Sequence, residues 1–214
     1  MRQQYDAFTI IIMSAGHRQT TAPPSSCAGG LTWSKIASKF HVPTDDLQRP
    51  TGIALGSNLG DRLAHLVQGR DLLFSLHEGA APAAFSRVYQ TEPVDCPPGS
   101  APFLNAVVEI RTSLNPDRLL RHLIRLESEL GRSATRGRNT PRPLDLDILY
   151  SGELVTDTPT LVLPHPRMAA RRFVLQPLAD VRPDFILPGD SRPVTQLLAA
   201  LPATPRAEVF RAAW

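Results

Sequence analysis

The sequence predicts an α+β fold with a ferredoxin-like β-α-β-β-α-β core, followed by a C-terminal elaboration. Three observations lead to this prediction. A short strand, a Gly-Ser-Asn turn and the start of a helix follow one another in residues 51–62. Two strand-like runs come next, at 84–94 and 103–112. A strongly periodic helix at 115–132 then leads into a strand at 143–150, which completes the order.

The two core helices have recognisable ends. The first runs to about His77, and Asp61 is expected in its first turn, where a carboxylate favours the helix dipole. The second has Asn115 as its predicted N-cap and Gly131 as its terminator. The C-terminal elaboration is expected to hold a hairpin and then short helices, at 152–166, 167–180 and 193–201.

Residues 51–214 are predicted to form one domain, and residues 1–50 an N-terminal extension that is flexible or weakly structured. With 42% apolar and 20% charged residues, the chain has the composition of a globular protein. The run 16–30 differs, because its Gly, Pro, Ser and Thr residues offer little to bury. The sequence does not reveal the role of the extension.

Membrane and secreted proteins are disfavoured. No apolar run approaches the roughly 20 residues of a membrane span, and residues 7–13 are too short for one. The two cysteines, Cys27 and Cys96, have neither disulfide-framework nor metal-site spacing. We therefore expect a cytoplasmic chain, and we expect it to be a monomer.

The basic residues are mainly arginines. The net charge is +3, and of 23 basic residues only Lys35 and Lys39 are lysines. The arginine fork suits phosphate groups, but a biased base composition of the coding DNA gives the same excess. Charge therefore argues only weakly for an anionic partner, and no nucleic acid is expected to bind.

The segment "RNTPRPLDLDILY", residues 138–150, carries the strongest chemical signal. In a strand, Asp145 and Asp147 point to one face, while Leu144, Leu146 and Ile148 point to the other. Two neighbouring carboxylates repel each other, so they favour a counterion. Mg²⁺ commonly takes one or two carboxylates and completes its shell with substrate phosphates and water. The alternative is an exposed strand face whose carboxylates are solvated or paired with arginine.

Four arginines precede this pair in a segment rich in Gly, Thr and Pro: Arg132, Arg136, Arg138 and Arg142. Such a segment can bend over a polyphosphate and donate bidentate hydrogen bonds to it. Carboxylates, metal ions and arginines together indicate phosphoryl or pyrophosphoryl transfer. The sequence has no G-x-x-x-x-G-K, so a Walker-type nucleotide site is excluded.

The motif "R-x-T-P-R-P-L-D-L-D-I-L" resembles the signature of the 6-hydroxymethyl-7,8-dihydropterin pyrophosphokinase family. Further matches occur in the family's order: "IALGSNLGDR", "TEPV", "FLNAVVEIRTSL", "LESELGR" and "LPHPRMAARRFVLQPLAD". The resemblance implies a ferredoxin-like enzyme of folate biosynthesis. Such an enzyme transfers pyrophosphate from ATP to 6-hydroxymethyl-7,8-dihydropterin and releases AMP, an ATP-dependent diphosphokinase reaction.

The resemblance also implies roles for single residues. Asp145 and Asp147 would bind two Mg²⁺ ions. The ATP-binding residues would be Glu127, Arg132, Arg142, Ile148, His165 and Arg171, and the catalytic residues would be Arg132, Arg142 and Asp147. Asp147 is only a candidate general base, by proximity. The loops at 92–102 and 133–141 would close over the site. His165, flanked by prolines, could instead be a turn residue that packs.

For the pterin, the resemblance implies five residues: Thr91, Val94, Phe103, Asn105 and Phe173. The two phenylalanines would sandwich the ring, a sensible geometry for a fused heterocycle, although both could simply belong to the core. Asn105 stands on a strand otherwise filled by apolar residues, so it requires a polar partner.

Three departures from the family pattern, at Ala134, Asn139 and Thr160, put nucleotide affinity in doubt, and Arg136 or Arg138 could compensate. Three other functions stay open. One is a catalytically impaired relative, and another is a different D-x-D metal-dependent, nucleotide-using transferase. The third is a non-catalytic RNA-binding module, which the lack of an aromatic RNA-recognition motif disfavours.

Overall fold

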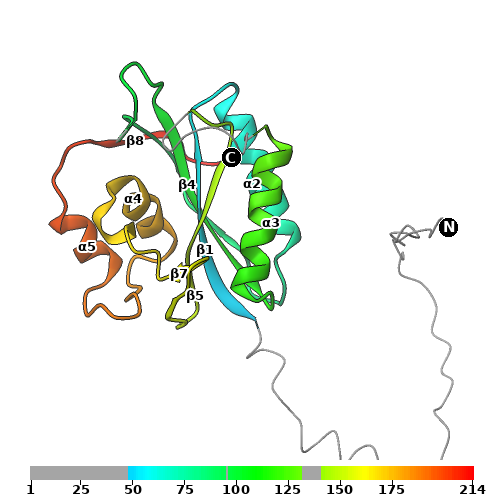
Figure 1. Ribbon diagram of the computed structural model, residues 1–214. Helices are drawn as coiled ribbons and strands as arrows, with labels where there is room; N and C mark the ends of the chain where they lie inside the picture. Colours follow the sequence, from blue (N-terminus) through cyan, green and yellow to red (C-terminus); the bar gives the residue numbers. More distant parts are fainter. Residues whose placement is uncertain (1–47, 95, 132–140) are drawn as a thin grey trace, which may run out of the picture. The chain divides into compact units, whose positions relative to one another are not determined.

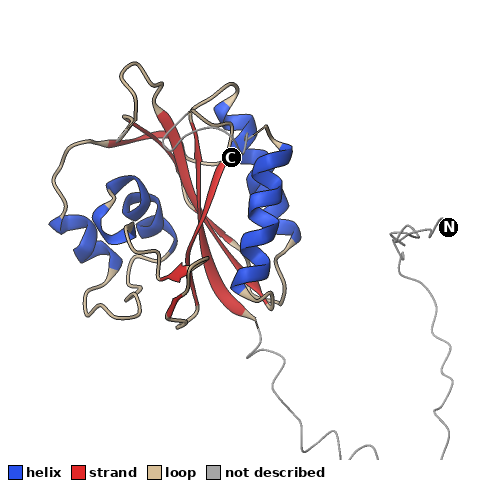
Figure 2. Ribbon diagram, viewed as in Figure 1, coloured by secondary structure: helices blue, strands red, loops and turns tan. Residues whose placement is uncertain are grey.

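A six-stranded antiparallel sheet forms the centre of the fold, with helices on both faces (Figures 1 and 2). The computed structural model describes residues 48–94, 96–131 and 141–214, and all structural statements concern these residues. The strands are β1 (Arg49–Ser57), β2 (Ala84–Phe85), β3 (Val88–Thr91), β4 (Phe103–Thr112), β5 (Asp145–Ser151) and β8 (Ala207–Arg211). The helices are α2 (Arg62–Ser75), α3 (Pro116–Glu129), α4 (Arg172–Val181) and α5 (Val194–Ala200).

The strand order is β5-β1-β4-β3-β8, and β2 pairs with β4 on the same side as β3. Every paired neighbour is antiparallel. Helix α2 connects β1 with β2 and β3, and α3 connects β4 with β5, so each helix crosses over a strand that lies between its two neighbours. The predicted α+β class is confirmed, in the form of helices mixed with antiparallel sheet.

Helices α2 and α3 cover one face of the sheet. Alternate residues of β1, β4 and β5 point into this layer, among them Ile53, Leu55, Leu146 and Ile148, and all of these are buried. Gly69 of α2 lies against the side chains of Leu144 and Leu55, so a larger residue there would separate helix and sheet. The predicted inward direction of the leucines around the two aspartates is confirmed.

Helices α4 and α5 cover the opposite face, which has its own core (Figure 1). Strand β5 contributes two consecutive residues to it, Leu149 and Tyr150, because the pairing with β1 shifts there and leaves Leu149 as an extra residue. This is a β-bulge. The Tyr150 ring crosses β1 over Gly52, where an added Cβ would overlap it, and its hydroxyl donates to Glu109 Oε2 at 2.6 Å.

Capping residues explain where the core helices start and stop. Asn115 caps α3 as predicted, accepting a hydrogen bond from Asp117 N at 2.9 Å. Gly131 follows the end of α3 with a positive φ of 94°, a conformation that favours glycine. The prediction for Asp61 was wrong by one position, since it is the N-cap of α2 and accepts from Ala64 N.

The prediction of one continuous strand at 84–94 is wrong, because two shorter strands occupy this range. The range is split into β2 and β3 because Ser86 Oγ, between them, accepts the hydrogen bond of Val107 N in place of a backbone carbonyl. The predicted hairpin is confirmed as β6 (Thr156–Asp157) paired with β7 (Val162–Leu163), and the two short helices are present as α4 and α5. A short 3-10 helix, η2 (Met168–Ala170), precedes α4, and β8 was not predicted.

The prediction of an N-terminal extension at 1–50 lies outside the described residues except at its last three positions, two of which belong to β1. Among the described helices, none combines the length and the apolar character that a membrane crossing requires.

Candidate active site

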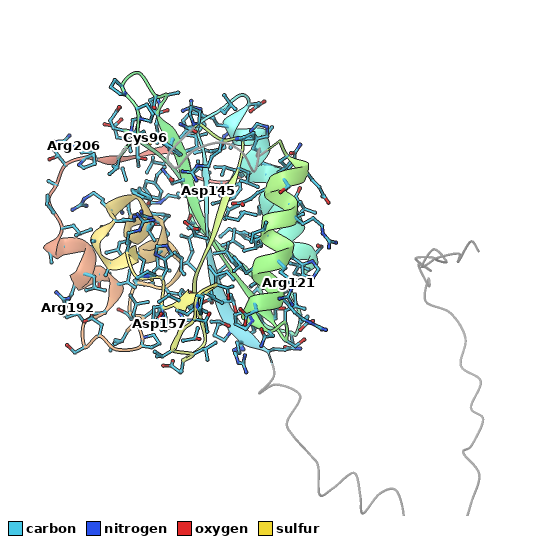
Figure 3. All side chains as sticks on the ribbon, viewed as in Figure 1. Cys96, Arg121, Asp145, Asp157, Arg192 and Arg206 are labelled. Carbon is cyan, nitrogen blue, oxygen red and sulfur yellow. The ribbon has the colours of Figure 1, made fainter. Side chains whose placement is uncertain are left out.

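A pocket opens on the α4 face of the sheet, where β3 ends and β4 and β5 begin. It brings together most of the residues singled out in the sequence. Its lining comprises Gly56, Thr91, Glu92, Val94, Cys96, Phe103, Asn105, Arg142, Asp145, Asp147, Arg171 and Phe173. Figure 3 shows Asp145 and Cys96 towards this end of the sheet and Asp157 near the other. Residues from four strands and from the start of α4 therefore meet at one place, together with residues of the loops before β4 and before β5.

Asp145 and Asp147 lie on the pocket side of β5, as predicted, because they alternate with the buried leucines. Both are partly exposed, and Arg142 Nη1 donates to Asp145 Oδ1 at 2.9 Å. Two hard oxygen groups in an open pocket suit Mg²⁺. No group of three or more metal-binding side chains occurs in the described part of the chain.

The proposed pterin residues occupy the other half of the pocket. Asn105 Nδ2 donates to Thr91 Oγ1 at 2.7 Å, and both side chains are buried. This bond uses one N–H of Asn105, so its carbonyl oxygen and second N–H, with the Thr91 O–H, remain for a ligand. Phe103 and Phe173 supply apolar walls. Buried polar groups beside flat walls match a polar-edged aromatic ligand.

Gly56 forms the floor between the two halves. It pairs with Asn105 of β4 on one side and with Asp145 of β5 on the other. An added Cβ would lie 3.4 Å from Asn105 Oδ1 and 3.8 Å from Asp145 Cβ. The missing side chain therefore leaves room where a ligand could reach both the amide and the carboxylate.

Arg171 lies at the start of α4, with its Cζ 5.4 Å from the centroid of the Phe173 ring. This geometry is a cation–π contact, which orients the guanidinium at the pocket wall. His165 is nearby but is not one of the lining residues. Burial lowers the pKa of His165; the charge of Asp147 opposes this shift, and Arg171 and Arg167 reinforce it.

Of the predicted ATP residues that the structure describes, Glu127 and Ile148 do not line the pocket either. Glu127 is buried on α3, where its Oε1 accepts from Leu146 N of β5 at 2.7 Å. Ile148 points into the core beneath α2 and α3, so only its backbone could meet a ligand. Arg132 lies outside the described residues, as do Arg136, Arg138, Ala134 and Asn139.

Some lining residues were not singled out in the sequence: Gly56, Glu92 and Cys96. Gly56 and Asn58 stand in the Gly-Ser-Asn turn, and that turn was the one available signal. Asn58 does not line the pocket, but its side chain and backbone both bond Arg142. No local pattern marks Cys96, whose position depends on the loop between β3 and β4.

Comparison with known proteins identifies the relatives of this chain. The family model of 7,8-dihydro-6-hydroxymethylpterin-pyrophosphokinase matches residues 52–183. A 2-amino-4-hydroxy-6-hydroxymethyldihydropteridine pyrophosphokinase of Bacillus subtilis is 46% identical over 129 residues, covering 60% of this chain and 75% of the relative. The enzyme of the same name from Pseudomonas aeruginosa is 43% identical over 150 residues, covering 70% and 90%.

Solved structures share the fold. The wild-type HPPK-DHPS of Plasmodium falciparum with pteroate has a TM-score of 0.53 at 15% identity, covering 71% of this chain and 42% of that one. An HPPK-DHPS in complex with substrates has a TM-score of 0.55 at 12% identity, covering 72% and 43%. This chain thus spans less than half the length of those solved chains. From the family model and the two bacterial relatives, we conclude that this chain belongs to the 7,8-dihydro-6-hydroxymethylpterin-pyrophosphokinase family.

Proposed function

We propose that this chain transfers pyrophosphate from ATP to 6-hydroxymethyl-7,8-dihydropterin, giving AMP and the pterin diphosphate of folate biosynthesis. One observation carries the proposal. A single pocket is lined both by the Asp145 and Asp147 pair and by the buried amide and aromatic groups of Asn105, Phe103 and Phe173. The first set suits a metal-bound polyphosphate, and the second suits a flat heterocycle.

In the reaction, the hydroxymethyl oxygen of the pterin attacks the β-phosphorus of ATP. A new bond forms between that oxygen and the β-phosphorus, while the bond from the β-phosphorus to the oxygen bridging to the α-phosphorus breaks. AMP leaves with the bridging oxygen, and the hydroxymethyl proton goes to a base. Asp147 is the candidate base, because it lines the pocket next to the proposed phosphate site.

Asp145 and Asp147 would hold two Mg²⁺ ions together with the phosphates of ATP, the co-substrate. Bound Mg²⁺ supplies neutralisation of phosphate charge. Arg142 and Arg171 both line the pocket and add positive charge to it, and Arg142 is already oriented by its bond to Asp145. Fixed donors of this kind stabilise charge that develops during transfer.

For the pterin, Thr91 and Asn105 would bond its polar edge, Val94 would contribute its backbone, and Phe103 and Phe173 would enclose the ring. The remaining ATP contacts are assigned to Glu127, Arg132, Ile148 and His165. Glu127 Oε1 already accepts a hydrogen bond from Leu146 N. To bind ATP, the Glu127 carboxylate would have to accept a hydrogen bond from the ribose as well, or exchange the bond from Leu146 N for it.

We further infer a ferredoxin-like core. The order β5-β1-β4-β3, with α2 and α3 as crossover helices on one face, supports it. The division into an extension at 1–50 and a domain at 51–214 is kept as a proposal, as is the monomeric state.

The test is an assay of AMP. The purified full chain is incubated with 6-hydroxymethyl-7,8-dihydropterin, ATP and Mg²⁺, and pterin-dependent AMP is measured. Asp145→Ala and Asp147→Ala should each lower the rate by about 100-fold or more, because each removes a fixed charge from the site of transfer. ADP in place of AMP would mean transfer of the γ-phosphoryl group and would overturn the proposal.

Asp157→Ala is the matched control, since Asp157 is an exposed aspartate of β6 near the other end of the sheet (Figure 3). It should keep the wild-type rate. If the wild type makes no pterin-dependent AMP although it binds ATP, the chain is a catalytically impaired relative.

A further inference from the structure

The loop between β1 and α2 contains a buried asparagine that bonds to the segment just before β5, the strand of the two aspartates. Asn58 is 3% exposed and lies directly after Ser57, the last residue of β1. Its backbone N–H donates to Arg142 O at 3.2 Å, and its side-chain Oδ1 accepts from Arg142 N at 2.9 Å. Asn58 therefore satisfies both backbone polar groups of one residue that is 84 positions away.

Arg142 depends on this contact because of its neighbours. In the run Pro141-Arg142-Pro143, only Arg142 has a backbone N–H, since proline has none. The ladder between β1 and β5 ends at the pair Gly56 and Asp145, so it does not reach Arg142. Asn58 takes the place of the missing ladder just before β5 begins.

The contact bears on the site because Arg142 is the residue it holds. With its backbone fixed, Arg142 directs Nη1 to Asp145 Oδ1 at 2.9 Å and lines the pocket. A shift of about 1 Å in such a group can lower a rate by about 100-fold. Within the described residues, Asn58 Nδ2 and Arg142 Nε are also buried and have no hydrogen-bond partner. Unsatisfied buried donors are costly, so their retention requires an explanation.

We propose that Asn58 is a positioning residue for the pyrophosphoryl transfer: it holds the Arg142 backbone so that the guanidinium stands between Asp145 and the polyphosphate. The inference rests on the proposed function. Asn58 acts through Arg142 and does not touch either substrate. Loss of its side chain therefore lowers kcat, whereas the KM of the pterin, which is set by Asn105 and the aromatic walls, changes little.

The test is a double-mutant cycle of Asn58→Ala and Arg142→Ala, with kcat and both KM values measured well below the melting temperature of each variant. Asn58→Ala should lower kcat by about 10- to 100-fold in the wild-type background. In the Arg142→Ala background it should lower kcat by less than about twofold, because residues acting through one another are not additive. An equal loss in both backgrounds would overturn the inference.

Asn115→Ala is the matched control for lost stability. It removes the same side chain and a comparable bond to a backbone N–H, Asp117 N at 2.9 Å, at the start of α3. It should lower the melting temperature and leave kcat unchanged. Asn58→Asp is a second control, for the case in which Asn58→Ala fails to fold. It keeps the Oδ1 acceptor of Arg142 N and the size of the side chain. It should retain at least about a third of the wild-type kcat, and a loss as large as that of Asn58→Ala would contradict the inference.

A measurement without turnover separates this inference from the proposed function. The Nε–Hε resonance of Arg142, assigned by NMR from Arg142→Lys, should shift in Asn58→Ala and not in Asn115→Ala. If the wild type makes no AMP, the proposed function fails, and the resonance alone decides whether Asn58 holds Arg142. An unchanged resonance in Asn58→Ala would show that Asn58 does not act through it.

Discussion

Two glycines on the same side of β1 illustrate how single residues shape this site. Gly56 and Gly52 both face α4, but their surroundings differ. A Cβ on Gly56 would meet Asn105 Oδ1 and Phe103 Cδ1 at 3.4 and 3.9 Å, which are ordinary contacts. A Cβ on Gly52 would overlap the Tyr150 ring. The missing side chain of Gly56 therefore leaves space for a ligand in the pocket, whereas that of Gly52 leaves space for the Tyr150 ring in the core.

Alanine at these two positions should have opposite effects. Gly56→Ala should fold with near-normal stability and raise the KM of the pterin about tenfold, because the new methyl group occupies the pocket floor. Gly52→Ala should lower the free energy of unfolding by about 1–3 kcal/mol, the usual cost of overpacking, and leave that KM unchanged. Urea denaturation and steady-state kinetics on both variants check this. A pterin KM that rises equally in both would refute the assignment of the pocket floor.

At the scale of elements, α4 is attached to the sheet by a polar contact with β3 and with Arg87, the residue directly before this strand. Arg87 forms an ion pair with Asp180 of α4 at 2.6 Å, and the Tyr89 hydroxyl donates to the same carboxylate at 2.8 Å. Burial and the bond to Asp180 raise the pKa of Tyr89 to about 12. Burial acts to raise the pKa of Asp180, but the bonds from Arg87 and Tyr89 outweigh it and lower that pKa. Because α4 begins with Arg172 and Phe173, this contact also holds one wall of the pocket.

The contact of Asp180 should make stability depend on pH. Its pKa is lower in the folded chain, so its contribution is present above the ordinary aspartate pKa of about 3.9 and is lost as the pH falls through the folded value. Asp180→Asn should therefore be less stable than the wild type at pH 7, and the difference should shrink by pH 3. Denaturant titrations at both pH values measure it. Asp184→Asn, at an exposed position, is the control, and a difference as large at pH 3 as at pH 7 would contradict the prediction.

At the scale of the whole molecule, the segment 207–214 contacts both the edge of the sheet and helix α2. Strand β8 pairs with β3 at the sheet edge, and Trp214 Nε1 then donates to Ser86 O at 2.7 Å. The Trp214 ring packs on the core below α2 and α3, and Arg70 of α2 lies 5.3 Å from its centroid. The last residue of the chain thus connects a strand edge with a helix on the face opposite the pocket.

Removal of Trp214 should affect stability without affecting catalysis. Trp214→Ala should lower the free energy of unfolding by about 2 kcal/mol. This loss is smaller than the loss on removing a fully buried tryptophan, because the Trp214 ring is only partly buried. Trp214→Phe keeps an aromatic ring at this position but loses the hydrogen bond of the indole N–H, so it should lower the free energy of unfolding by only about 1 kcal/mol. Both should keep the wild-type kcat. Equal losses in the two variants would mean that the ring contributes nothing beyond its N–H.

Much of the core could be predicted because its signals are local. The strand-like run 103–112 predicted β4 with the bounds observed, and Asn115 and Gly131 predicted both ends of α3 to within a few residues. The direction of Asp145 and Asp147 followed from strand periodicity alone. Local signals cannot reveal where a side chain replaces a backbone carbonyl as hydrogen-bond acceptor. The break at Ser86, whose Oγ accepts from Val107 N, was missed for this reason. Strand β8 was missed because most of it is exposed, so burial imposes no alternation on it.

The site was predicted in part, and the missing part has one physical cause. Residue types and the family resemblance indicated which groups lie in the pocket, including Asn105 and Phe173. The contact between Asn58 and Arg142 spans 84 residues and depends on where two loops end in space. A sequence pattern records neighbours along the chain, so it contains no trace of such a bond. The binding and catalytic roles assigned to all the site residues stay predictions, including those of Glu127, Ile148 and His165 in ATP binding.

The bulge at Leu149 determines how strand β5 tolerates changes of length. In an unbroken strand, inserting or deleting one residue would exchange the faces of every later side chain. Here the extra residue already resets the alternation between Asp147 and Tyr150. The direction of the side chains before the bulge therefore does not fix the direction of those after it. The carboxylates of the first half can point to the pocket while Tyr150, in the second half, lies over Gly52. Natural variants of this strand should accordingly accept an insertion or deletion at position 149 far more readily than at 146.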